Sequence, residues 1–261
     1  MARSALLNVM VQAALKAGRS LARDFGEVQN LQVSLKGPAD FVSQADRKAE
    51  EIVFNELSRA RPGYAFLMEE RGAVPGEDDQ HRWIVDPLDG TTNFLHGLPV
   101  FAVSIALERQ GQIVAGVVYN PAMDELYTAE RGGGAYMNDR RLRVAARRDF
   151  ADAVIATGVP HLGKPNHDRF REELARVQIK VSGIRRFGSA ALDLAWVASG
   201  RVDGFWERHL KSWDMAAGVL LVREAGGFVT DAQGGDAMLT NGSIVAGNEA
   251  MHGELLKLVK A

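Results

Sequence analysis

Carboxylates that directly follow apolar runs are the residues of this chain whose types and spacing could do chemistry. The segment WIVDPLDGTTNFLHGLP, residues 83–99, places Asp86 and Asp89 immediately after such a run. In α/β proteins the ends of strands deliver side chains to the rim of a sheet, where ligands bind. Carboxylate oxygens suit a hard cation such as Mg²⁺. Two carboxylates rarely complete such a site, so we expect further acids to converge on this segment.

Two further segments supply candidate acids. FLMEE ends an apolar run in Glu69 and Glu70, and SWDMAAGVLLVREAGG places Asp214 near the start of a predicted helix. Each acid alone also has a commoner role: a solvated strand end for Glu69 and a helix cap for Asp214. Hydrogen bonds within a turn account for one of Asp86 and Asp89 better than for both. These alternatives stay open for each residue taken singly.

The residues after the two aspartates, Gly90, Thr91 and Thr92, predict a tight turn into a helix. Glycine permits the turn, and a threonine can cap the first helical turn. Free N–H groups and the helix dipole make such an end favourable for anions. We therefore expect ligands for a cation and an N-terminus for a phosphate side by side.

Several other chemistries lack the residues that they need. The chain has no cysteine, which excludes disulfides, thiolate metal sites and cysteine nucleophiles and fits a reducing cytoplasm. Its six histidines show no metal-site spacing, so we expect surface or core roles for them. No G-x-x-x-x-G-K-[ST] loop and no G-x-S-x-G elbow is present, and GGG at 132–134 predicts a turn.

The charge and hydropathy of the chain predict a soluble, cytoplasmic protein. A net charge of −2 gives no basic field, so we expect neither direct nucleic-acid binding nor membrane attachment. No segment approaches the roughly 20 uninterrupted apolar residues that span a bilayer. The first 25 residues have polar interruptions at helical intervals, which predicts an amphipathic helix rather than a signal peptide.

The order of the expected elements changes near residue 148. Before it, helices are followed by adjoining strands, with a hairpin turn at Gln110-Gly111; after it, short strands alternate with helices. We predict an α/β protein in two parts: an α+β half, residues 1–148, with most candidate ligands, and an α/β half, residues 149–261, with Asp214. The site should lie between the halves.

Taken jointly, these segments resemble the inositol monophosphatase family of Mg²⁺-dependent phosphatases. WIVDPLDGTTNFLHGLPVFAVSIAL matches its most diagnostic signature, and WDMAAGVLLVREAGG matches the second. KGPADFVSQAD, FLMEE and GSAALDLAWVASGRVDGFWE resemble further family segments, although Met68 stands where glycine is frequent. The resemblance implies a layered αβαβα sandwich of the inositol monophosphatase and fructose-1,6-bisphosphatase type, usually a homodimer.

The resemblance also implies a set of metal ligands. A first Mg²⁺ would be held by Glu69, Asp86 and the backbone carbonyl of Leu88, and a second by Asp86, Asp89 and Asp214. A third, weaker ion would lie beside Glu69, and Li⁺ is implied as an inhibitor at the second position. Such ions lower the pKa of a water and neutralise phosphoryl oxygens in an in-line displacement.

The remaining site residues follow from the same resemblance. Glu69, Asp46 and Thr91 form the implied catalytic group, in which Asp46 hydrogen-bonds Thr91 and Thr91 positions the attacking water. Lys36 is placed on a loop near the metals. The implied substrate-binding residues are Asp89, Gly90, Thr91, Gly188, Ala190 and Glu207.

The function implied is hydrolysis of myo-inositol monophosphates and related small polyol phosphates. Glu207 in DGFWE favours a hydroxyl-rich alcohol, because a carboxylate accepts hydrogen bonds from hydroxyls, although a solvated strand-end acid is the alternative. The same chemistry could act on histidinol phosphate, 3′-phosphoadenosine phosphate, fructose 1,6-bisphosphate or NADP. The preferred alcohol depends on loops that the sequence does not define.

A binding protein is the contrasting class. Bacterial relatives of this kind have been linked to transcription complexes through protein contacts. GIRRFG offers Arg185 and Arg186 for such a contact, although a salt-bridged or dimer-facing role is commoner for an arginine pair.

Overall fold

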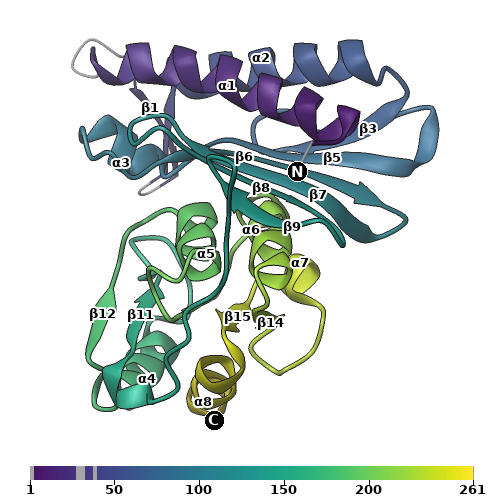
Figure 1. Cartoon of the computed structure of the whole chain (residues 1–261). Helices are drawn as coiled ribbons and strands as arrows, with labels where there is room; N and C mark the ends of the chain where they lie inside the picture. The colour runs from purple at the N-terminus through teal and green to yellow at the C-terminus, as the bar shows by residue number, and fades with distance from the viewer. Residues whose placement is uncertain (1–2, 28–32, 38–39, 261) are drawn as a thin grey trace.

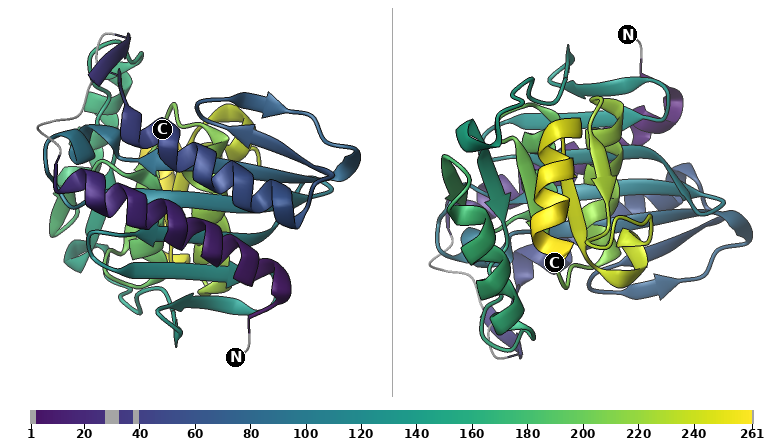
Figure 2. Two further views of the ribbon diagram at one scale, coloured as in Figure 1. Left: turned by 90° about the horizontal axis from the view of Figure 1, so that it is seen from above. Right: turned by 90° about the horizontal axis from the view of Figure 1, so that it is seen from below.

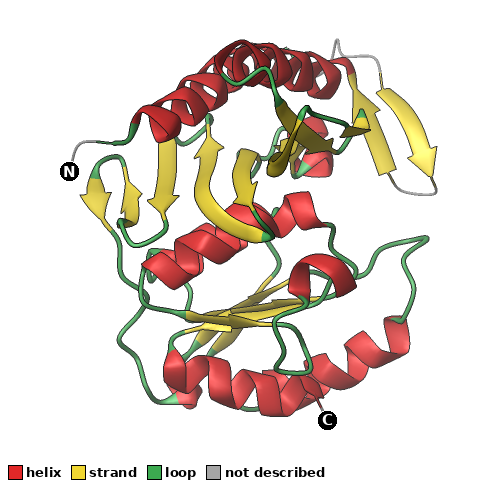
Figure 3. Ribbon diagram, turned by 90° about the vertical axis from the view of Figure 1, so that its right-hand side faces the viewer, coloured by secondary structure: helices red, strands yellow, loops and turns green. Residues whose placement is uncertain are grey.

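Helices and sheets alternate in layers through the molecule (Figure 1). The structure is a computed structural model that describes residues 3–27, 33–37 and 40–260, with side chains described in 3–27 and from residue 44 onward. Figure 3 shows the succession of helices, strands, helices, strands and helices from one side. The layered α/β fold that the sequence predicts is therefore confirmed.

Two long helices, α1 (Ala5–Phe25) and α2 (Gln44–Ala60), form the first layer and lie across the strands beneath them (Figure 2, left). The hydroxyl of Ser4 caps α1 by accepting a hydrogen bond from the Leu7 N–H at 3.0 Å. One face of α1 is buried at helical spacing, so the predicted amphipathic helix is confirmed. That face includes Leu7, Met10, Val11, Ala14 and Leu21.

The second layer is an eight-stranded sheet in the order β10-β9-β8-β7-β6-β5-β3-β4. The turn at Gln110-Gly111 has positive φ at both residues, which confirms the predicted hairpin. Among the described strands of this sheet only β3 and β5 pair in parallel, and Met68 lies opposite Val85. The strands are β3 (Tyr64–Met68), β4 (Gly72–Val74), β5 (Asp78–Asp89), β6 (Ala102–Arg109), β7 (Gln112–Asn120), β8 (Glu125–Glu130), β9 (Gly134–Met137) and β10 (Arg140–Arg141).

The third layer consists of α5 (Ala190–Ala198) and α6 (Ser212–Glu224), which lie between the two sheets (Figures 1 and 3). Every residue of α5 is buried, as is the stretch 215–222 of α6, and a helix that is apolar on all sides requires cover on all sides. One hydrophobic core cluster joins residues of the first sheet, both helices and the second sheet.

The second sheet has five strands in the order β12-β11-β13-β15-β14. Strands β11, β12 and β13 run parallel, while β15 pairs in antiparallel fashion with β13 and β14. The helices α4 (His167–Gln178) and α8 (Glu249–Lys260) cover its outer face (Figure 2, right). The strands are β11 (Val154–Thr157), β12 (Gly183–Arg185), β13 (Gly204–Glu207), β14 (Phe228–Thr230) and β15 (Ile244–Gly247).

The change from one sheet to the other falls between β10 and β11, near the predicted boundary at residue 148. Because one core cluster includes residues from both sides of it, the division into 1–148 and 149–261 stays a prediction. Among the described helices, none is long and apolar enough to cross a bilayer. The remaining short elements are β1 (Val33–Gly37), β2 (Asp40–Ser43), α3 (Thr91–Leu95), η2 (Phe150–Asp152) and α7 (Met238–Asn241).

Candidate active site

The parallel pairing of β3 and β5 brings two of the predicted metal ligands together. Glu69 follows β3, and its N–H donates to the Val85 carbonyl at 3.3 Å, directly before Asp86. Strand β5 does not end at Asp86: it continues through Pro87 to Asp89, with an irregularity in its pairing to β6 between the two aspartates. This irregularity allows both aspartates and the intervening backbone to face one region.

The alternative role for these aspartates, stabilising a turn by a hydrogen bond, is also partly right. Asp86 accepts a hydrogen bond from the Leu88 N–H at 3.0 Å, which is the local bond typical of an aspartate in a turn. The side chain of Asp86 is only 2% exposed, however, so this residue is not a surface turn acid. A buried carboxylate with one backbone donor still requires further positive partners.

Asp89 is fixed by the start of α5, on the opposite half of the chain. Its Oδ2 accepts hydrogen bonds from the Ser189 hydroxyl at 2.6 Å and from the Ala191 N–H at 2.7 Å. Burial raises the pKa of Asp89 to about 6, although these hydrogen bonds oppose the shift. Ser189 was not predicted as a site residue, and the only available signal was its place at the start of a segment with a helical pattern.

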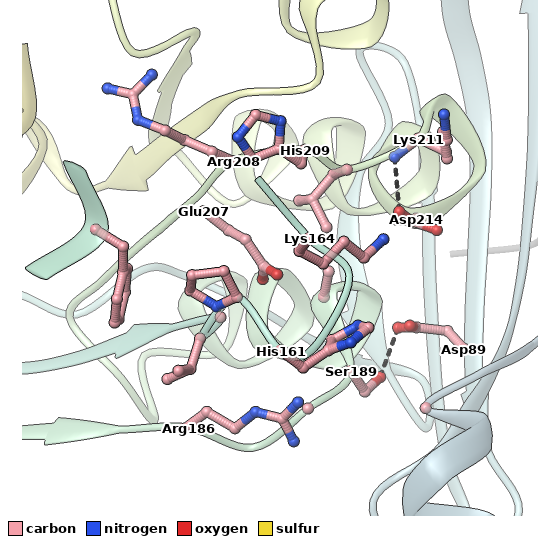
Figure 4. Close-up of a pocket in the computed structure, with 18 of the residues that line it drawn as sticks. Asp89, His161, Lys164, Arg186, Ser189, Glu207, Arg208, His209, Lys211 and Asp214 are labelled. Atoms are coloured by element: carbon pink, nitrogen blue, oxygen red, sulfur yellow. Dashed lines mark hydrogen bonds between the residues drawn. The ribbon is translucent and has the colours of Figure 1, made fainter. Parts of the chain in front are cut away.

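Asp214 lies in the first turn of α6 and has the cap role that was left open for it. Its Oδ2 accepts a hydrogen bond from the Lys211 N–H at 2.7 Å (Figure 4). It also lines the same cavity as Glu69 and Asp89. Burial and then the charge of Asp89 raise the pKa of Asp214 to about 8. The cap and a ligand role are therefore compatible in this residue.

Asp86 lies at the centre of the negative charge. Its pKa is raised well above the usual range by burial and then by the carboxylates of Glu69, Asp89, Asp214 and Asp46. Four acids around a fifth one repel each other in a region of low dielectric, and a cation bound among them would relieve that repulsion. All of these donors are oxygen atoms, which is the ligand type that Mg²⁺ and Ca²⁺ prefer.

A second group of acids, in which the carboxylate oxygens lie close to one another, adjoins the first. Asp46, Glu69 and Glu70 bring carboxylate oxygens within 4.8 Å of one another, so these three residues could hold a metal ion. Asp46 is buried in the first turn of α2. Asp86, Asp89 and Asp214 do not belong to this closely spaced group. Glu70 was a candidate acid in the sequence but was not predicted as a site residue.

The turn at Gly90 differs in detail from the prediction. Gly90 has a φ of 91° and is itself the N-cap of α3, so the prediction that Thr91 or Thr92 caps this helix is wrong. A Cβ on Gly90 would lie 2.8 Å from the Val100 carbonyl oxygen, which together with its φ requires glycine here. The Thr91 hydroxyl instead donates to the Leu88 carbonyl at 2.9 Å. Its implied bond to Asp46 stays a prediction.

A cavity of about 320 Å³ extends from these acids toward the second sheet. Figure 4 shows Glu207 pointing into it from the end of β13, opposite Asp89. Gly188 and Ala190, two of the predicted substrate residues, also line it. Burial, followed by the charges of Asp214 and Asp89, raises the pKa of Glu207 to about 8. Lys36 lies in β1, whose side chains are outside the described part of the structure.

Several basic side chains line this cavity and were not predicted as site residues. Arg186 faces it from the segment before α5, although it was considered only as an interaction or dimer contact (Figure 4). Arg185 is exposed and donates to the Ile184 carbonyl. No spacing in the sequence marks the other basic residues of the lining, which are His161, Lys164, Arg208, His209 and Lys211.

The raised pKa values predict how the stability of the metal-free protein depends on pH. Asp214 titrates at about 8 instead of 3.8, so the folded state binds more protons between these values and stability falls as pH rises through that window. In chelator, we expect the Tm to fall from about pH 5.5 to 8 more steeply in the wild type than in Asp214→Asn. The exposed Asp79→Asn variant should keep the wild-type slope. Equal slopes for wild type and Asp214→Asn would contradict the assignment.

Comparisons with known proteins identify the family of this chain. A sequence profile described as "Inositol monophosphatase family" matches residues 2–261. An "Inositol-1-monophosphatase" of Mesorhizobium japonicum is 76% identical over 260 residues, covering 100% of this chain and 98% of the relative. The solved structure of extragenic suppressor protein suhB from Bartonella henselae has 69% identity and a TM-score of 0.96 and covers 98% of this chain and 99% of that one. "Nus factor SuhB" of Escherichia coli is 45% identical over 243 residues, 93% of this chain and 91% of the relative. The chain belongs to the inositol monophosphatase family.

Proposed function

We propose that this protein is a Mg²⁺-dependent phosphatase that hydrolyses inositol monophosphates and similar small polyol phosphates. The observation that supports this most directly is the cavity with two chemically different ends. Glu69, Asp89 and Asp214 line one end, where a cation and a phosphate are expected, and Glu207 lines the other. A cavity of about 320 Å³ is of the size that encloses a small ligand. A relative with 76% identity has the name of this activity.

The acids fit a two-ion or three-ion site. We assign Glu69, Asp86 and the carbonyl of Leu88 to a first Mg²⁺, and Asp86, Asp89 and Asp214 to a second. A third ion beside Glu69 is supported by the closely spaced oxygens of the group that includes Glu69. When bound, such ions neutralise phosphoryl oxygens and make a water acidic enough to act as a nucleophile at neutral pH. Inhibition by Li⁺ stays a prediction.

The side chains and backbone of this chain then orient the reaction. Hydrogen bonds from Ser189 and Ala191 to Oδ2 fix the orientation of the Asp89 carboxylate, which is proposed to bind the cation. The Thr91 hydroxyl donates to the Leu88 carbonyl, and Thr91 is proposed to direct a water toward phosphorus. The N–H groups of Gly90 and Thr91 are proposed to bind the phosphate. The helix dipole contributes little, since α3 has only five residues.

The end of the cavity that Glu207 lines, here called the alcohol end, is proposed to recognise hydroxyl groups of the substrate. Glu207 points into the cavity, and a carboxylate or carboxyl there can accept hydrogen bonds from a polyol (Figure 4). Gly188 and Ala190 form the adjacent wall. Arg186 provides positive charge near Glu207 and lowers its pKa against the larger effect of burial. Polyols expose many hydroxyls, whereas aryl alcohols offer none to this end.

A partner-binding role is the second candidate. It is favoured by one observation: a relative with 45% identity is named "Nus factor SuhB". The two functions need not exclude each other on one chain. A partner interaction that survives Asp89→Asn, together with loss of turnover in the same variant, would assign them to separate features. A homodimer also stays a prediction.

Turnover should depend on a divalent cation. We expect inositol 1-phosphate hydrolysis to stop in excess chelator and to return with Mg²⁺, because the carboxylates repel each other without a cation. Asp89→Asn should lower kcat/KM by at least about 100-fold at saturating Mg²⁺, with the exposed Asp79→Asn variant as control. Full activity in chelator, or in Asp89→Asn, would refute the proposed mechanism.

Thr91 should affect turnover more than metal binding. Removing its hydroxyl in Thr91→Ala should reduce kcat by roughly 100-fold, the lower range for a group that directs a proton or a water in the transition state. Thr91→Ser keeps the hydroxyl and should recover most of the rate. The affinity for Mg²⁺, measured from the increase in Tm, should change less than about threefold in both variants. Normal turnover in Thr91→Ala would show that the role is assigned wrongly.

A further inference from the structure

Gly158 follows β11 directly and lies beside the end of β13. The two strands are parallel, and Thr157 is the register partner of Trp206. The Thr157 hydroxyl fixes this register by donating to the Trp206 carbonyl at 2.8 Å. Because parallel strands deliver their carboxyl ends to one edge of a sheet, the next residues, Gly158 and Glu207, become neighbours at the cavity. Both residues line that cavity.

The Glu207 carboxyl occupies the space that a side chain at position 158 would need. A Cβ built on Gly158 would lie closer than 3.0 Å to Oε1, Cδ and Oε2 of Glu207. Gly158 does not have a positive φ, so its backbone could accommodate alanine. The side chain of Glu207, and not the backbone conformation, therefore accounts for glycine at this position.

The carboxyl held in this position is available to a ligand. Among the residues that the structure describes, none donates a hydrogen bond to Glu207 or forms an ion pair with it, and its pKa is shifted by burial and neighbouring charges. Its carboxyl points into the cavity toward the side occupied by Asp89 (Figure 4). A half-buried carboxyl without a protein donor gains from a ligand that donates hydrogen bonds to it.

We propose that Gly158 is a specificity-determining residue. By having no side chain, it leaves space for the Glu207 carboxyl at the alcohol end of the cavity, where the carboxyl accepts hydrogen bonds from a polyhydroxylated alcohol. This inference rests on the proposed function and goes further than it, because it assigns alcohol selectivity to a residue that itself offers no group to the substrate. Any side chain at position 158 would displace the carboxyl and weaken the preference for polyols.

The test is the selectivity of Gly158→Ala. We expect kcat/KM for inositol 1-phosphate to fall at least about tenfold, because the site loses an acceptor for a substrate hydroxyl. The value for p-nitrophenyl phosphate should stay within about twofold, because that alcohol makes no such bond. The Tm should change little, since the displaced group is the flexible end of a side chain. The matched control is Gly253→Ala in α8, where a Cβ meets no atom within 4 Å and both activities should be unchanged.

A double-variant cycle separates action through Glu207 from other effects. In a Glu207→Ala background, adding Gly158→Ala should cause no further loss of selectivity for the polyol ester. Unchanged selectivity in Gly158→Ala, equal losses on both substrates, or additive losses in the double variant would each overturn the inference. If the wild type itself shows no preference for the polyol ester, the proposed substrate class fails as well. If the wild type prefers the polyol ester and Gly158→Ala keeps the same preference, only the role of Gly158 is refuted.

Discussion

Repulsion among buried and half-buried carboxylates is the constraint on which the rest of this structure depends. Asp86 is buried beside four other acids, and this burial and the neighbouring carboxylates raise its pKa well above the usual range. Such an arrangement lowers stability in the absence of a bound ion, and a cation bound among the acids would relieve the repulsion. The parallel pairing of β3 and β5 is what places Glu69 next to Asp86.

The same site joins the two parts of the chain. Asp89, from the first sheet, is held by Ser189 and Ala191 at the start of α5. Asn93 donates to the carbonyls of Val100 and Phe187 at 2.8 and 2.7 Å and thereby ties α3 to the segment before α5. These bonds fix Asp89 relative to the side of the cavity that Glu207 lines, which comes from the other part of the chain. Changes in the packing of α5 should therefore alter the position of Asp89 and of the acids beside it.

The order of elements and the positions of the acids could be predicted because they are local properties of the sequence. Apolar runs that end in acid specify strand ends, and a 3.6-residue periodicity specifies α1. The capping of α3 could not be predicted, because threonine and glycine both suit the position and packing against Val100 decides between them. The positions of Arg186 and Ser189 depend on how α5 packs against the first sheet, which no local pattern describes.

The central claim is that the converging acids bind divalent cations, and the position of a bound ion tests it most directly. Mn²⁺ accepts the same carboxylate ligands as Mg²⁺ and scatters X-rays anomalously. Crystals soaked in Mn²⁺ should give anomalous peaks coordinated by Glu69, Asp86, Asp89 and Asp214. The account is contradicted if well-ordered crystals give no peak among these side chains, or only peaks elsewhere on the molecule.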